Sequence, residues 1–336
     1  MKILYSILLS LLAIAAAASA AKPLRIYFID VEGGQATLFV APSGQSLLID
    51  TGWGDYGNRD ADRIAAAAKD AGVSTLNYMV ITHYHDDHVG GVPQLAAKMK
   101  IETFIDHGPN REDSDDTRNN YAAYEKAAQG AKRLTVKPGD RIPVEGLDVE
   151  VLSADGQTIP SPLAGAGQAN PLCPTEPVPA EDLSENQRSA GVLITYGKLR
   201  VLDLGDLTKK RELQLACPKN LIGRVDLFVV THHGSTDSNA RALVDALHAR
   251  VAIMDNGARK GASPDAWQTV HDAPGLQDLW QIHYAMANGK QRNVGADFIA
   301  NLDENCQGKS ITVVAEPDGT MTVTNTRTGF NKTYEK

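Results

Sequence analysis

The segment HYHDDH at residues 83–88 restricts the fold more than any other part of the chain. It follows the apolar run NYMVIT, which predicts a buried strand, and precedes GVPQLAAKMK, which predicts a helix with Pro93 in its first turn. Sheets of the α/β type bind ligands at the carboxyl ends of their strands. We therefore expect a sheet that presents this polar segment at one edge.

The side chains of this segment suit a divalent metal. Three of the nine histidines of the chain lie within it, a clustering that is unusual for an ordinary polar loop. In an extended loop His83 and His85 point the same way, whereas Asp87 and His88 fall at the helix start and point elsewhere. Imidazole and carboxylate are the ligands expected for zinc or a similar ion. One short segment can thus serve two adjacent metals.

The rest of the chain alternates between apolar runs and helical segments. Strands are predicted at residues 24–31, 36–41, 46–52, 101–106, 133–144, 147–154, 191–197, 199–206, 225–235, 251–256 and 309–325, the last with a hairpin turn at Asp318-Gly319. Helices are predicted at residues 60–71, 91–100 and 121–129, from Ser238, and around Trp267. This order indicates a sheet with helices against one face.

Residues 155–184 differ from the alternating segments. They are rich in proline and glycine and show no apolar period, which predicts an irregular insertion joining two halves of one domain at residues 21–336. Long loops in compact domains are often lids over a site. The acidic stretch EDSDD at residues 112–116 is interpreted as a solvated loop.

The N-terminal sequence and the net charge of the chain indicate where the protein is located and which partners it binds. Lys2, an apolar stretch to about residue 17 and the sequence Ala-Ser-Ala at 18–20 predict a signal peptide at residues 1–20, and hence a secreted or periplasmic protein that leaves the membrane after cleavage. The formal net charge is −8, and we find no basic stripe, so long nucleic acid is not favoured as a partner. An exported chain permits one disulfide among Cys173, Cys217 and Cys306, but the sequence does not choose the pair.

The segment at 83–88 also resembles the HxHxDH motif of the metallo-β-lactamase superfamily. Further features of that superfamily follow in chain order, with IDTG upstream and LGD and THHGS downstream. The resemblance implies an α/β (α+β) fold, namely an αββα four-layer sandwich, with a dinuclear zinc site at the strand ends and with manganese as an alternative metal. The metal ligands that it implies are His83, His85, Asp87, His88, Asp206, His232 and His233.

The resemblance also implies individual roles. Asp206 bridges the metals, and Asp87 and His88 hold the second one together with one histidine of HHGS. We favour His233 for this position because it directly precedes the glycine, which leaves His232 either to support the ligands or to face the substrate. Asp50 supports the site through hydrogen bonds, although a plain turn explains Asp50 equally well.

One position departs from the family pattern. The third histidine of the first metal normally precedes a strand, where this chain has Asn186 and Ser189. The first site is therefore weak, or His107 at the end of a neighbouring strand completes it. The remaining histidines are interpreted as structural residues; they are His248, His271 and His283.

The opening DVEGGQATLFV, the Asn-x-x-Ser and the later strands resemble the soluble hydrolase domain of the DNA-uptake protein ComEC and its stand-alone relatives. This resemblance implies hydrolysis of a phosphodiester or other small substrate by water activated on a metal, which lowers the pKa of water towards ~7. Asp87 is then expected to orient the water and His232 to contact a substrate oxygen. The alternatives are a lactonase or β-lactamase-like hydrolase, and a non-catalytic metal-dependent binding protein.

Overall fold

A computed structural model describes residues 22–336 of the protein. The expected signal peptide at residues 1–20 lies outside these residues. Within the described part of the chain, no helix has both the length and the apolar character that crossing a membrane requires.

The first sheet unites the two ends of the described chain. Its strands lie in the order β18 (Asn331–Tyr334), β17 (Met321–Asn325), β16 (Ile311–Ala315), β1 (Leu24–Phe28), β2 (Thr37–Val40), β3 (Ser46–Ile49), β4 (Thr75–Val80), β5 (Lys100–Asp106) and β6 (Lys132–Thr135). The strands from β3 to β6 pair in parallel, whereas the others pair antiparallel. The parallel strands therefore end at one edge, where residues 81–88 begin.

The second sheet brings another set of strand ends to the site. Its strands lie in the order β15 (Ile299–Asn301), β14 (Asp278–His283), β13 (Val251–Met254), β12 (Leu227–Val229), β11 (Leu199–Asp203), β10 (Gly191–Tyr196), β8 (Asp148–Ala154) and β7 (Arg141–Ile142), and β9 (Gln157–Thr158) pairs with β8. The strands from β11 to β15 are parallel. Asp206 and the two histidines of THHGS follow the carboxyl ends of β11 and β12.

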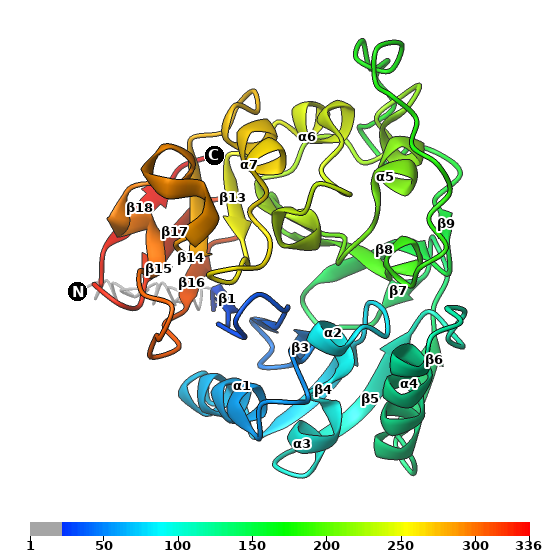
Figure 1. Cartoon of the computed structure of the whole chain (residues 1–336), viewed down its shortest axis with the longest axis vertical. Coiled ribbons are helices and arrows are strands. Elements are labelled where there is room, and N and C mark those ends of the chain that lie inside the picture. Colours follow the sequence, from blue (N-terminus) through cyan, green and yellow to red (C-terminus); the bar gives the residue numbers. More distant parts are fainter. Residues whose placement is uncertain (1–21) are drawn as a thin grey trace, which may run out of the picture.

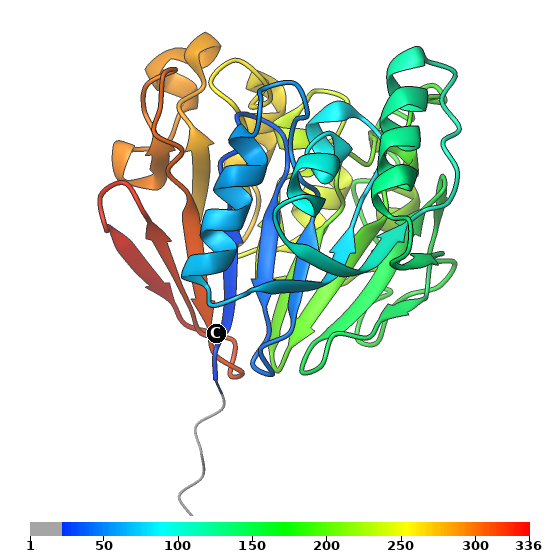
Figure 2. The ribbon, with the colours of Figure 1, turned by 90° about the horizontal axis from the view of Figure 1, so that it is seen from below.

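Helices cover the outer faces of the two sheets. Figure 1 shows α1 (Arg59–Asp70), α3 (Val92–Ala96) and α4 (Asp115–Ala127) on one side of the molecule, and α5 (Lys209–Ala216), α6 (Arg241–Leu247) and α7 (Pro264–His271) on the opposite side. Figure 2, turned by 90°, shows α1 and α4 in front of the strands of the first sheet. The expected αββα sandwich is therefore confirmed.

The alternation of side chains along the strands explains these layers. In β3, Leu47 and Ile49 are buried between the sheets, while Leu48 packs under the helices of the first side. In β12, Leu227 belongs to the core between the sheets and Phe228 to the core under the helices of the second side. Both faces of each strand are buried, which is typical of sheets covered by helices.

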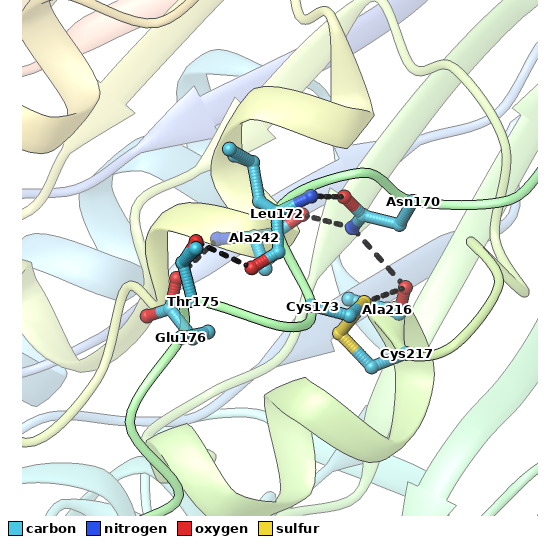
Figure 3. The surroundings of a disulfide bond; sticks show 8 residues. All are labelled: Asn170, Leu172, Cys173, Thr175, Glu176, Ala216, Cys217 and Ala242. Atoms are coloured by element: carbon cyan, nitrogen blue, oxygen red, sulfur yellow. Dashed lines mark hydrogen bonds between the residues drawn. A yellow bond between two sulfur atoms is a disulfide. The ribbon is translucent and has the colours of Figure 1, made fainter.

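The insertion at residues 155–184 is fastened to the second half of the molecule over much of its length. A disulfide joins Cys173 to Cys217 at the end of α5 (Figure 3). The buried amide of Asn170 donates to the carbonyl oxygens of Ala216 and Ala242, at 3.2 and 2.7 Å. The segment around Cys173 is therefore structural, and a role of the remaining insertion as a lid stays a prediction.

Several expected elements differ from the structure. The acidic stretch at 112–116 is exposed at Asp113, Asp115 and Asp116, as expected, but it is only partly a loop: helix α4 begins at Asp115 with the Ser114 side chain as its N-cap, and Glu112 contacts a histidine of the site. Residues 133–144 form two short strands in different sheets, β6 and β7. Strands β14, β15 and β18 were not expected, because they are short or carry polar residues.

Candidate metal centre

Four buried side chains converge at the carboxyl ends of the strands. The short helix α2 (Asp86–Val89) supplies Asp87 and His88, the turn after β11 supplies Asp206, and the turn η2 (Thr231–Gly234) supplies His233. Each offers one ligand atom, and these atoms lie within 4.8 Å of one another. His88 Nε2 lies 3.2 Å from each of Asp87 Oδ2, Asp206 Oδ1 and His233 Nε2.

These four side chains fit a divalent metal. Asp206 Oδ1 is buried and lies 3.2 and 3.4 Å from two imidazole nitrogens, yet it accepts no hydrogen bond within the described structure. A buried oxygen without a partner is costly unless another group satisfies it. Ligand atoms around a tetrahedral zinc ion lie ~3.3 Å apart when the bonds are ~2.0 Å long. The observed spacing is close to this value, so a shared cation would satisfy the unpaired oxygen.

A carboxylate lies behind each of three histidines of the site. The pairs are Asp50 Oδ2 with His88 Nδ1 at 2.7 Å, Glu112 Oε2 with His85 Nε2 at 2.9 Å, and Asp255 Oδ1 with His233 Nδ1 at 3.2 Å. Histidines that bind metals commonly have such a partner, which fixes the orientation of the ring and the nitrogen that is free to coordinate. Neither Glu112 nor Asp255 was expected at the site from the sequence. Asp255 follows β13 much as Asp206 follows β11. Its position after an apolar strand was the one sequence feature that could have indicated a place at the site.

Asp50 occupies the supporting position that the resemblance implied. Besides His88, its carboxylate accepts hydrogen bonds from the amide and the hydroxyl of Thr82, at 2.8 and 2.7 Å. Asp50 itself adopts a left-handed backbone conformation, with φ of 60°. Burial raises the pKa of Asp50, while His88 and Thr82 oppose this shift. The network fixes the His88 ring between the two sheets.

The backbone of the THHGS turn is constrained at the site. His232 and His233 both have positive φ angles, 55° and 52°, which non-glycine residues rarely adopt. Such conformations cost free energy and persist where the surroundings enforce them, often at functional sites. Gly261 packs so closely on this turn that a Cβ there would overlap the carbonyl oxygen of His233. The turn directs His233 into the cluster and leaves His232 at its margin, with Nε2 3.2 Å from Asp206 Oδ2.

The surroundings shift the pKa values of His88 and His83 in opposite directions. Burial opposes a charged His88, but Asp206, Asp87 and Asp50 raise its pKa well above the usual value. Burial, followed by repulsion from His88 and His85, lowers the pKa of His83 well below the usual value. His83 is thus a neutral imidazole with a lone pair available for a metal.

His83 and His85 lie beside the four-residue cluster. His83 Nε2 is 3.1 Å from His85 Nδ1, and the rings of His83 and His88 are 4.1 Å apart. The Ser189 hydroxyl lies 3.5 Å from His83 Nδ1 and accepts a hydrogen bond from the Asp206 amide at 3.2 Å. In place of the family's third histidine, Ser189 therefore holds the backbone of the expected bridging residue.

Asn186 and His107 lie farther from the cluster. The Asn186 side-chain oxygen is buried without a hydrogen-bond partner in the described structure, and this residue lines the neighbouring pocket. His107 Nε2 pairs with Glu185 at 2.8 Å, and both side chains are fully buried. The structure thus joins His107 to Glu185 and not to His83 or His85, and its role as a ligand of the first metal stays a prediction.

Lys260 is a site residue that the sequence did not reveal. Its ammonium group contacts the Asp87 carboxylate, donates to the Gly33 carbonyl at 2.9 Å and lies 4.9 Å from the centre of the Trp53 ring. About a third of its side chain is exposed, so it borders the opening of the site. No motif surrounds Lys260, and only the tertiary fold brings it to Asp87.

A pocket of about 570 Å³ lies next to the site. Its walls are residues 177–182 of the insertion, Asn186, and the segments that follow Asp206 and precede Ser238, including Lys209, Lys210 and Asp237. Its lining includes Thr208, two residues after Asp206, and Thr236, which follows the THHGS turn, but none of the four residues of the cluster.

Comparisons with known proteins agree with this geometry. Residues 30–171 match the family described as the Metallo-beta-lactamase superfamily. The chain is 26% identical over 230 residues to Recombination protein 2 of Haemophilus influenzae, covering 68% of this chain and 24% of that protein. It is 25% identical over 188 residues to ComE operon protein 3 of Bacillus subtilis, covering 55% of this chain and 20% of that protein. The matches thus span a quarter or less of these relatives.

A solved structure, Tm1679, is described as a metal-dependent hydrolase of the β-lactamase superfamily. It is 14% identical to this chain with a TM-score of 0.44, covering 78% of this chain and 96% of that one. Together, the family match and the ComE-like relatives show that residues 30–171 of the chain form part of a metallo-β-lactamase superfamily domain.

Proposed function

We propose that the protein is an exported metal-dependent hydrolase that cleaves phosphodiester bonds. The observation that carries the choice of substrate is Lys260, a cation at the opening of an otherwise acidic metal site. Lys209 and Lys210 line the neighbouring pocket together with Glu181, Asp182 and Asp237, so that pocket supplies no net positive charge. A single cation at the metal site of an acidic protein favours an anionic substrate of limited length over a long nucleic acid.

Asp87, His88, Asp206 and His233 would hold one divalent metal, and His83 and His85 would contribute to a second with Asp206 between them. Such ions act as Lewis acids that polarise a phosphoryl oxygen and acidify water. Zinc suits the nitrogen and oxygen donors, and manganese is the alternative. The site of His83 and His85 has fewer ligands, so a titration with zinc should resolve two affinities, with the weaker one lost in His85→Ala.

The surrounding residues orient the substrate. Lys260 can exchange its contact with Asp87 for a non-bridging phosphoryl oxygen once Asp87 binds a metal. His232 is partly exposed, with Nδ1 held by the Ser238 hydroxyl at 3.2 Å, so its Nε2 can turn from Asp206 to a substrate oxygen. The buried network of Asp50 and Thr82 keeps His88 fixed during these exchanges.

Three substrates distinguish this proposal from the alternatives. Protein reconstituted with zinc or manganese is assayed with bis-p-nitrophenyl phosphate, a lactone and a chromogenic cephalosporin. We expect hydrolysis of the phosphodiester, with a loss of at least ~100-fold in Asp206→Ala. His271→Ala is the control, because His271 is an exposed residue far from the cluster in the fold.

Preferential hydrolysis of the lactone or the cephalosporin would replace the phosphodiesterase assignment with the second hydrolase class. No hydrolysis of any of the three by metal-loaded protein would favour a binding protein. Export is tested separately, by N-terminal sequencing of the protein recovered outside the cytoplasm. An intact Met1 in that fraction would contradict cleavage of a signal peptide.

A further inference from the structure

A second group of ligand-type side chains lies outside the candidate metal centre. Asp30 and Glu32 follow β1, His283 ends β14, and Cys306 lies in the segment between β15 and β16. Each offers one ligand atom, and these atoms lie within 4.8 Å of one another. Asp30 and His283 are fully buried, and Glu32 and Cys306 are partly buried. None of these residues takes part in the proposed hydrolysis.

The distances in this group are close to those around a zinc ion. His283 Nε2 lies 2.7 Å from Asp30 Oδ1 and 3.7 Å from Glu32 Oε2. Cys306 Sγ lies 3.2 Å from Asp30 Oδ2 and 3.3 Å from Glu32 Oε1. Tetrahedral zinc with bonds of ~2.0 Å to oxygen or nitrogen and ~2.3 Å to sulfur keeps its ligand atoms ~3.3 to ~3.5 Å apart. His283 and Cys306 approach different oxygens of each carboxylate, so zinc binding would require rotation of the two carboxylates and a separation of His283 from Asp30 by roughly 0.6 Å more than observed.

The surroundings are arranged as outer partners of such ligands. Arg63 reaches Glu32 Oε1 at 3.1 Å and Asp30 Oδ2 at 3.2 Å, and the Asn301 amide lies 3.3 Å from Asp30 Oδ2. The Gly308 amide donates a hydrogen bond to Cys306 Sγ at 3.4 Å. Hydrogen-bond donors that hold the ligands in this way tune and orient metal sites. With Arg63 balancing one carboxylate, a dication also matches the remaining charge of a carboxylate and a thiolate.

We propose that Asp30, Glu32, His283 and Cys306 bind one zinc ion as a structural site. One sulfur, one nitrogen and two oxygen donors suit zinc better than magnesium, calcium or manganese, which prefer oxygen donors alone. Four protein ligands close the tetrahedron and leave no position for a substrate, as in structural zinc sites. Binding releases the thiol proton of Cys306 to solvent, and no electrons are transferred.

The position of this site indicates a structural role for a bound zinc ion. It connects the loop after β1 in the first sheet to β14 and to the β15–β16 segment of the second half. That loop also contacts the candidate metal centre, because the Gln35 amide donates to the Asp87 carbonyl at 3.1 Å and the Gly33 carbonyl accepts from Lys260. Gly34 lies so close that a Cβ would overlap the Asp87 carbonyl oxygen. The zinc would therefore fix the loop that supports Asp87.

Zinc X-ray absorption tests the proposal, because the candidate metal centre contains no sulfur ligand. The protein is prepared without reductant, so that Cys173 and Cys217 stay paired and one free thiol per chain remains. With zinc added, we expect a Zn–S distance of ~2.3 Å in the wild type. The same shell should persist in His88→Ala, which removes a ligand of the other site, and disappear in Cys306→Ser with the loss of one zinc per chain.

Thermal unfolding provides a second measurement that does not depend on hydrolysis. Zinc should raise the melting temperature of His88→Ala but not that of the double variant His88→Ala/Cys306→Ser, since a ligand stabilises only the state that binds it. Absence of a Zn–S shell in zinc-saturated wild type would overturn the proposal even if the cysteine variant failed to fold. A Zn–S shell that survives Cys306→Ser, or a wild-type Cys306 consumed in an intermolecular disulfide, would also overturn it.

Discussion

The contact between Asp50 and His88 determines which nitrogen of the ring faces the metal cluster. Asp50 Oδ2 accepts the Nδ1 proton at 2.7 Å, so Nε2, which faces Asp87, Asp206 and His233, is the nitrogen that would lose its proton to bind a metal. In Asp50→Asn the amide oxygen remains with the Thr82 amide, because the opposite orientation would place two N–H groups against each other. The new amide nitrogen then donates to His88 Nδ1. The proton moves to Nε2 and blocks coordination.

The expected effect of this substitution is a loss of metal affinity. Removing the hydrogen-bond partner of a metal-bound histidine costs ~10- to ~100-fold in affinity, or roughly 1.4 to 2.7 kcal/mol. The measurement is a competition titration of zinc against a chromophoric chelator in wild type, Asp50→Asn and the exposed control Asp272→Asn. Unchanged zinc affinity in Asp50→Asn would refute the argument that Asp50 selects the tautomer of His88.

Three further predictions concern pH, the disulfide and the substrate. Burial raises the pKa of Glu212 to about 7. The contribution of the neutral Glu212 to stability should therefore be complete below pH ~4.5 and be lost as the pH rises through 7, which lowers the free energy of unfolding by up to roughly 3 kcal/mol. Glu212→Gln should abolish this pH dependence in urea unfolding between pH ~5 and ~8, and an unchanged slope would contradict the prediction. Opening the Cys173–Cys217 disulfide, which spans 44 residues, should lower the free energy of unfolding by about 2 to 4 kcal/mol, as compared in Cys173→Ser/Cys217→Ser and wild type. Lys260→Met should raise KM at least several-fold for a phosphodiester and much less for a neutral lactone, and equal changes for both would show that Lys260 does not recognise the anion.

The parts of the site that could be predicted from the sequence are those defined by short spacing. His83, His85, Asp87 and His88 are local to one strand end, and the turn that carries His233 also has a short motif. Similarly, the apolar runs of β3 and β4 identified buried strands. These features depend on neighbours in the chain, which a sequence displays directly.

The residues that the sequence did not reveal depend on tertiary contacts. Glu112 meets His85 across 27 positions, and Lys260 meets Asp87 across 173. From its acidic sequence neighbours, Glu112 was interpreted as part of a solvated loop. Its contact with His85 depends on where helix α4 begins, which those neighbours do not show. Likewise, His283 was interpreted as an ordinary structural residue, since Cys306 and Asp30 approach it only when the two sheets pack together.

Anomalous diffraction from crystals of the zinc-loaded protein tests the metal-dependent hydrolase assignment most directly. The account predicts a strong peak at the zinc absorption edge within ~2.0 to ~2.2 Å of the ligand atoms of Asp87, His88, Asp206 and His233. The peak should be lost in Asp206→Ala. The absence of a peak among these four side chains in the zinc-saturated wild type would contradict the account.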